Sequence, residues 1–137
     1  MMGTNETILT PKQMDILRLR NEGYSYEEIA KRSGTTKQNI HSIEKMALRN
    51  MKRAENTIKF MKLLKAPIWF SVDENTDLEN VVRRIYSEAN GANIHIVYDA
   101  LSLSTKIREE AMNKIEHRLI VRGFEVGITK EGDVILI

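Results

Sequence analysis

Cysteine is absent from this 137-residue chain, so disulfides, thiolate metal sites and cysteine nucleophiles are excluded. The only histidines are His41, His95 and His117, and no two have the His-x-x-His or His-x-x-x-His spacing of a helical metal site. A glycine-rich phosphate loop is also missing, because residues 90–93 (NGAN) form too short a segment and follow a predicted helix. We therefore expect no enzyme activity, no catalytic residue, no metal and no cofactor.

Long apolar runs are missing too, and none approaches the ~20 residues of a membrane span. The first residues, MMGTNET, lack the basic and apolar regions of a signal peptide. Hydrophobic residues make up 42% of the chain and charged residues 29%, which is typical of a folded soluble protein. We expect a cytoplasmic protein that does not contact a membrane, with a core small enough to benefit from a dimer interface.

The net charge of +2 is unevenly distributed. Residues 1–66 hold 13 basic and 7 acidic side chains (net +6), whereas residues 67–137 hold 8 and 12 (net −4). A basic half suits a nucleic-acid partner. Its only aromatic residues are Tyr24, Tyr26 and Phe60, too few for the stacking platforms of single-strand readers. Double-stranded DNA is therefore the expected partner, and RNA the weaker alternative.

Residues 26–45 are predicted to form two short helices around a tight turn. Ser25 and Glu28 have the spacing of a capping box, which satisfies the N–H groups at a helix start. Gly34 supplies a residue that tolerates positive φ beyond a helix C-terminus. Small Ala30 allows the two helices to cross closely. This pattern is typical of a helix-turn-helix.

The second of these helices has two distinct faces. Thr36 or Thr35 is expected to cap it, while Ile40, Ile43 and Ala47 form its inner face. In helix-turn-helix proteins the N-terminal part of this helix enters the major groove. Its other side carries Gln38, His41, Ser42, Lys45 and Arg49, while Thr36 and Lys37 stand at its exposed N-terminus. The predicted DNA-binding residues are Lys37, Gln38, His41 and Ser42 for base edges, and Thr36, Lys45 and Arg49 for the backbone.

A preceding helix is expected to complete a three-helix core, with Thr10 as N-cap and Pro11 at the first helical position. Lys31 and Arg32 end the helix before the turn. They serve either a DNA phosphate or the negative end of their own helix.

Beyond Lys45 the chain has no glycine or proline until Pro67, so the helix is expected to continue to Lys65, either unbroken or with a bend near Asn50. Two interpretations remain open: a dimerisation helix or connector, and simple packing over the core. The helix carries one apolar stripe, formed by Ile40, Ile43, Ala47, Met51, Ala54, Ile58 and Met61. The predicted domains are residues 1–66 and 67–137.

The second half is predicted to be a small α/β domain with about four strands, which makes the whole chain α+β. A capping box at Thr76 and Glu79 begins a helix between strands at Ile68–Val72 and Ile94–Tyr98, suggesting a parallel β-α-β crossover. Further predicted elements are a helix over 99–113, strands at 119–121, 124–128 and 134–137, and a hairpin turn at 130–133.

An alternative role for this half is effector sensing, with a small molecule or ion bound between strand ends and helix starts. The candidate wall residues are Trp69, Asp73, Asp77, Tyr98 and Asp99. Against this, Trp69 and Phe70 also suit a core or a dimer contact.

Residues 9–58, LTPKQMDILRLRNEGYSYEEIAKRSGTTKQNIHSIEKMALRNMKRAENTI, resemble the Tfx-type DNA-binding regulators of archaea. The tail segments YDALSLSTKIREEA and VGITKEGDVILI share this resemblance, which covers nearly the whole chain. More loosely, IHSIEKMALRNMKRA is similar to the promoter-reading region of bacterial sigma factors. The resemblance implies a transcriptional regulator with an N-terminal helix-turn-helix domain. We expect a homodimer on a two-fold-related or repeated DNA site.

Overall fold

The computed structural model describes residues 6–137. The chain divides into two compact units, and the boundary between Asn56 and Thr57 falls inside the long helix α3 (Lys37–Lys65). We refer to residues 6–56 as the N-terminal unit and to residues 57–137 as the C-terminal unit. The domain boundary predicted at Pro67 is two residues beyond the end of α3 and stays a prediction.

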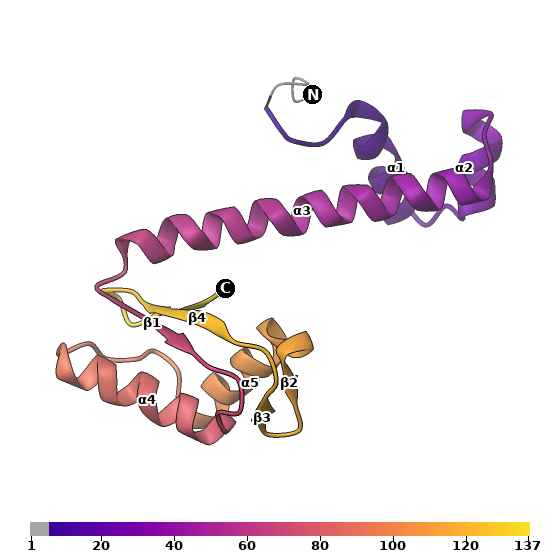
Figure 1. The fold of residues 1–137 in the computed structure, drawn as a ribbon. Helices are drawn as coiled ribbons and strands as arrows, with labels where there is room; N and C mark the ends of the chain where they lie inside the picture. The colour runs from indigo at the N-terminus through magenta and orange to yellow at the C-terminus, as the bar shows by residue number, and fades with distance from the viewer. Residues whose placement is uncertain (1–5) are drawn as a thin grey trace. The chain divides into compact units, whose positions relative to one another are not determined.

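The N-terminal unit consists of α1 (Pro11–Asn21), α2 (Tyr26–Ser33) and the first part of α3 (Figure 1). Thr10 caps α1, because its side chain accepts a hydrogen bond from the Gln13 backbone N–H at 3.1 Å. The predicted capping box of α2 is also confirmed: the Glu28 N–H donates to Ser25 Oγ at 3.1 Å, and the Ser25 N–H donates to Glu28.

The core of this unit forms where the three helices meet. Ile16 of α1, Ile29 and Ala30 of α2 and Ile40 of α3 are all buried. Burying an isoleucine side chain contributes about 1.5–3 kcal/mol, so three of them supply much of the stability of so small a core. The predicted inner face of α3 is confirmed at Ile40 and Ala47, which are fully buried.

α3 is one unbroken helix, which resolves the question of a break near Asn50. Its predicted apolar stripe behaves differently along its length. Burial ends at Ala47, and Met51, Ile58 and Met61 on the same stripe are exposed. Core packing alone therefore does not account for the second half of the stripe.

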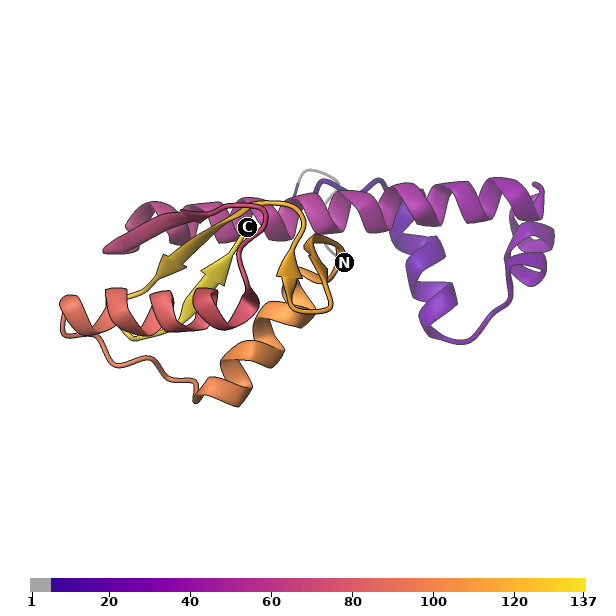
Figure 2. The same cartoon turned by 60° about the horizontal axis from the view of Figure 1, so that its bottom comes forward.

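The C-terminal unit is built on an antiparallel sheet in the order β1 (Ile68–Val72), β4 (Phe124–Ile128), β5 (Val134–Leu136). Two helices, α4 (Leu78–Gly91) and α5 (Ala100–Glu110), lie on one face of this sheet (Figure 2). The α+β class is confirmed, because the short strands β2 (Ile115–Glu116) and β3 (Leu119–Ile120) bring the total to five, in two sheets.

The two faces of this sheet have different covers. Phe70, Val126 and Ile128 belong to the large core beneath α4 and α5. On the other face, Leu63 of α3 packs directly on Gly127, where any larger residue would meet the leucine methyl group. The last turns of α3 thus belong to the C-terminal unit.

The prediction of a parallel β-α-β crossover is wrong. β1 pairs with β4, in antiparallel register, with Phe70 opposite Val126. The segment Ile94–Tyr98 is not a strand, although the Val97 N–H donates to the Gly132 carbonyl at 3.1 Å. Its alternating composition reflects side-chain burial, since Ile96 enters the core while His95 and Val97 are exposed.

The predicted capping box of α4 is also wrong. The Asp77 carboxylate caps this helix by accepting from the Glu79 N–H at 2.8 Å, while the Thr76 hydroxyl donates to the Asp73 carbonyl at 2.7 Å. Asp and Thr are both good N-caps, so one-residue ambiguity is expected when they are adjacent. The helix predicted over 99–113 is α5, and it is followed by a 3₁₀ turn, Met112–Lys114.

Gly132 and Gly91 offer a matched test of these contacts. Gly132 has φ +89°, and an added Cβ would collide with the His95 carbonyl oxygen, whereas Gly91 ends α4 with open space around it. We expect Gly132→Ala to lower the free energy of unfolding by more than about 1 kcal/mol, and Gly91→Ala to raise it by about 0.4–1 kcal/mol. Urea unfolding followed by circular dichroism measures both. Equal effects would contradict the close approach of residues 95 and 132.

Candidate nucleic-acid interface

The turn between α2 and α3 is only three residues long and depends on Gly34. This glycine has φ 68° and ψ 35°, in the left-handed region, and its N–H donates to the Ala30 carbonyl. The next N–H, of Thr35, also donates to Ala30, at 3.1 Å. These bonds satisfy the free carbonyl at the end of α2 while the chain reverses direction.

α3 then begins with a side-chain cap from Thr36, whose hydroxyl oxygen accepts from the Asn39 N–H at 3.1 Å. Thr35, the other candidate, has a different role, because its hydroxyl accepts from the Asn39 side-chain amide at 2.9 Å. The remaining N–H groups at the start of α3 lie at the positive end of the helix dipole, where an anion binds favourably.

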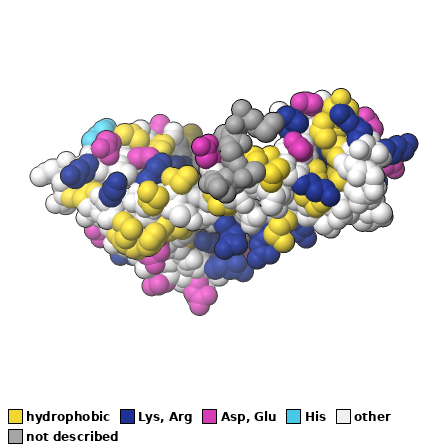
Figure 3. All heavy atoms as spheres, turned by 90° about the horizontal axis from the view of Figure 1, so that it is seen from above, with side chains coloured by type: hydrophobic (Ala, Val, Ile, Leu, Met, Phe, Trp, Pro, Cys, Tyr) yellow, Lys and Arg dark blue, Asp and Glu magenta, His cyan; other side chains and the backbone are white. Residues whose placement is uncertain are grey.

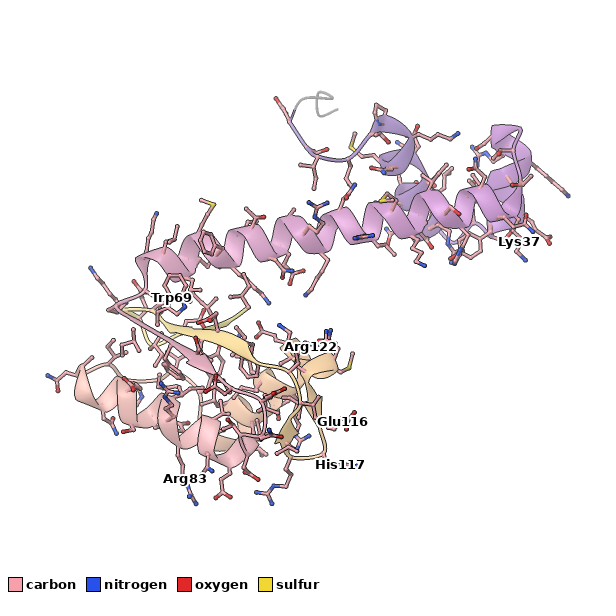
Figure 4. The ribbon with its side chains drawn as sticks, in the orientation of Figure 1. Lys37, Trp69, Arg83, Glu116, His117 and Arg122 are labelled. Carbon is pink, nitrogen blue, oxygen red and sulfur yellow. The ribbon has the colours of Figure 1, made fainter. Side chains whose placement is uncertain are left out.

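The seven predicted DNA-binding residues are all solvent-exposed: Thr36, Lys37, Gln38, His41, Ser42, Lys45 and Arg49. At 100° per residue, Gln38, Lys45 and Arg49 fall on the side of α3 opposite to Ile40 and Ala47, which are buried. Lys37 lies at the start of the helix and is directed into solvent (Figure 4). The core therefore sets which side of α3 faces outward.

The cationic members of this set are available to an external anion. Within residues 6–137, Lys37, Lys45 and Arg49 form no ion pair. In contrast, Arg32 lies over the ring of Tyr24, with 4.9 Å between the guanidinium carbon and the ring centroid. A cation–π contact of this kind favours a structural role for Arg32 over phosphate binding.

A polar network that the sequence analysis did not identify joins all three helices. Tyr26 of α2 donates to one Glu44 carboxylate oxygen at 2.6 Å, and Arg20 of α1 donates to the other at 3.1 Å. The Arg20 guanidinium also stacks on the Tyr26 ring, at 4.0 Å, and donates to the Tyr24 carbonyl at 2.8 Å. The hydrogen bond to Glu44 raises the pKa of the Tyr26 hydroxyl.

This network also supports one of the exposed residues. The His41 ring packs edge-on against Tyr26, with 5.3 Å between centroids and an interplanar angle of 77°. Glu44 is only 14% exposed, so its two hydrogen bonds are stronger than those of an open surface pair. The sequence feature that could have predicted this network is the position of Glu44, four residues after Ile40 and on the otherwise apolar inner face of the helix.

The structure does not gather the five predicted effector-binding residues into one site. Asp77 and Asp99 cap α4 and α5, and the bond from the Ser102 N–H holds the pKa of Asp99 below its usual range. The Tyr98 hydroxyl donates to Asp133 at 2.7 Å, which raises the pKa of Tyr98. A depression of about 510 Å³ is lined by Tyr98 but by none of the other four.

The indole of Trp69 donates to Glu125 at 2.8 Å. Asp73 uses its backbone carbonyl to accept from Thr76. Among residues 6–137, no group of three histidine, aspartate or glutamate side chains is arranged to hold a metal ion. Over the same residues, no helix is both long and apolar enough to cross a membrane.

Comparison with protein-family models divides the chain close to the boundary between its two units. Residues 8–53 match the model of region 4 of sigma-70. Residues 54–136 match the model of the C-terminal region of the DNA-binding protein Tfx. The first match covers α1, α2 and the exposed N-terminal part of α3, and the second covers nearly all of the C-terminal unit.

Curated relatives match almost the whole chain. The DNA-binding protein Tfx of Methanothermobacter marburgensis is 35% identical over 133 residues, which covers 97% of this chain and 96% of the relative. A putative transcriptional regulatory protein of Methanocaldococcus jannaschii is 36% identical over 129 residues, covering 94% of each chain. A protein of the same description from Methanococcus vannielii is 33% identical over 129 residues.

Glu44 offers a test of the three-helix network. We expect Glu44→Ala to lower the free energy of unfolding by about 1–3 kcal/mol, because the Tyr26 hydroxyl and the Arg20 guanidinium both lose their acceptor. Glu27→Ala, at an exposed position of α2, is the control and should change stability by less than about 0.5 kcal/mol. Urea unfolding measures both variants. Similar losses in the two would show that the network adds no more than an ordinary surface charge.

Proposed function

This chain belongs to the Tfx family of DNA-binding proteins, and we propose that it is a transcriptional regulator that binds double-stranded DNA in a sequence-specific manner. The N-terminal part of α3 enters the major groove, and α2 with the intervening turn sets its orientation. The observation that carries this proposal is the exposure of Gln38, Lys45 and Arg49 on the side of α3 that faces away from Ile40 and Ala47. The other four predicted residues, Thr36, Lys37, His41 and Ser42, are also exposed at the start of this helix.

The side chains at the start of α3 have the chemistry of base readout. The Gln38 amide can donate to and accept from adenine N7 and N6 together, and the Lys37 ammonium can donate to guanine O6 and N7. Ser42 and His41 lie one turn further along and bind either base edges or phosphates. The contact of His41 with Tyr26 restricts its ring, which reduces the entropy lost when it binds.

The remaining residues suit the sugar-phosphate backbone. Lys45 and Arg49 lie on the same side of α3 as Gln38, two and three turns further along the helix. Thr36 uses its hydroxyl oxygen as a cap, and its hydroxyl proton remains available to a phosphate. Backbone contacts of this kind fix the position of the protein on the duplex, while base contacts supply sequence preference.

We further propose that the protein acts as a homodimer on two half-sites, because a single recognition helix reads only a few base pairs. The named relatives come from archaea, whose DNA lies in the cytoplasm, and we assign this chain to the same compartment. The effector-sensing alternative has less support, since Asp77 and Asp99 are used as helix caps. RNA binding is the weaker alternative because the exposed side of α3 offers no row of aromatic rings.

Gln38 and Lys45 are expected to differ in what they contribute to binding. Gln38→Ala should cost about 1–3 kcal/mol on the preferred site and relax base preference at one position. Lys45→Ala should weaken binding to all sequences alike and reduce the dependence of log K on log salt by about one unit. Fluorescence anisotropy with duplexes selected from a random pool, at two salt concentrations, measures both effects.

Lys12→Ala, on the exposed side of α1, serves as the control for loss of a single positive charge. It should change affinity less than Lys45→Ala does. If Gln38→Ala and Lys45→Ala produce the same pattern across sequences and salt, the division between base and backbone contacts is wrong. If neither variant changes affinity, α3 is not the recognition helix.

A further inference from the structure

The C-terminal part of α3 exposes a group of large apolar side chains. Ile58, Met61 and Leu64 are 54%, 55% and 60% exposed, and Met51, two turns before Ile58, is 47% exposed. Figure 3 looks down on α3 and shows hydrophobic side chains at the surface of this part. We call Met51, Ile58, Met61 and Leu64 the apolar face of α3.

This face is not the one that α3 uses within its own unit. Leu63 is buried against Gly127, and on the helical wheel it lies about 140–160° from Ile58 and Met61. Met51, Ala54, Ile58 and Met61 alternate in steps of three and four residues, which is the spacing of positions a and d in a coiled-coil heptad. Such a spacing favours a second helix as the binding partner.

The size of the face suits a dimer contact. Four large side chains, each about half exposed, present on the order of 400 Å² of apolar surface, which is the range in which exposed patches mark interaction sites. A stable interface buries about 800 Å² on each partner, with an apolar centre and a polar rim. The apolar face would form such a centre, and the charged residues along α3 would form the rim.

Charges beside the face favour an antiparallel arrangement of two copies. Glu55 and Lys62 are one heptad apart, so they lie on the same side of α3. In a parallel pair these two e positions would face g positions of the partner, which here are the uncharged Asn50 and Thr57, so neither charge would meet an opposite one. In an antiparallel pair centred between residues 58 and 59, Glu55 of one copy faces Lys62 of the other, twice.

We propose that the apolar face of α3 binds the same face of a second copy of this chain, with the two helices antiparallel. This inference rests on the proposed homodimer and specifies its surface. At 1.5 Å per residue, the two α3 N-termini then lie about 65 Å apart along the helix pair. That distance is close to two turns of B-DNA, or ~68 Å, so half-sites two turns apart are expected.

The first experiment replaces the centre of the face. The double variant Ile58→Lys/Met61→Lys should dissociate to monomers in sedimentation equilibrium, with a dissociation constant raised by about 100-fold or more, whereas wild type sediments as a dimer. Both positions are exposed, so the variant should fold. Leu101→Lys/Met112→Lys, which changes exposed apolar residues of α5 and of the 3₁₀ turn, is the control and should remain dimeric.

The second experiment tests the antiparallel orientation. Lys62→Glu alone should weaken the dimer, because Glu55 would then face a glutamate, and Glu55→Lys/Lys62→Glu should restore it. In a parallel pair neither residue faces a charge of the partner, so Lys62→Glu would leave the dimer unchanged and the double variant would have no loss to reverse.

Wild type that remains monomeric at high micromolar concentration, or an Ile58→Lys/Met61→Lys variant that remains dimeric, would overturn this inference. So would failure of the charge exchange to restore association. Binding to a duplex that carries a single half-site distinguishes failure of this inference from failure of the proposed function. The monomeric variant should bind that duplex as wild type does, and loss of this binding in both proteins would contradict DNA recognition itself.

Discussion

The packing of Ile40 against Ile29 and Ala30 is the contact on which the candidate interface depends. It fixes the rotation of α3 about its own axis, and with it the direction of every side chain at the start of that helix. If α3 were rotated about its axis by 100°, the angle between successive residues, Gln38 and Lys45 would no longer point directly away from the core, and other residues would take their place. Gly34 makes this contact possible, because only a residue that tolerates φ 68° lets α3 return across α2 after three residues.

The polar network around Glu44 adds orientation to that apolar contact. Hydrophobic packing is not directional, so isoleucine against alanine tolerates sliding along the helix axis. Hydrogen bonds from Arg20 and Tyr26 to the two oxygens of one carboxylate do not tolerate it. The N-terminal unit thus combines a small apolar core with directional hydrogen bonds to Glu44, and these hydrogen bonds compensate for the small area that the core buries.

Local signals predicted the N-terminal unit well and the C-terminal unit less well, for a physical reason. Helix caps and the glycine turn act within four residues, so Thr10, Ser25 and Gly34 identify their elements from the sequence alone. Strand pairing acts over long distances, and β1 finds its partner β4 more than fifty residues away. Ile94–Tyr98 has the alternating pattern of a strand because Ile96 is buried. Such a pattern shows which side chains are buried, but it does not show whether the backbone pairs with another strand.

The candidate site could be predicted because helical periodicity alone separates Gln38, Lys45 and Arg49 from Ile40 and Ala47. The Glu44 network could not, since a carboxylate on an apolar side has no recognisable partner until the fold brings Arg20 and Tyr26 to it. The apolar stripe on α3 combines residues that pack in the core with residues that stay exposed. Its first half faces a core and its second half is exposed at Ile58 and Met61, so one sequence period serves folding up to Ala47 and a different contact beyond it.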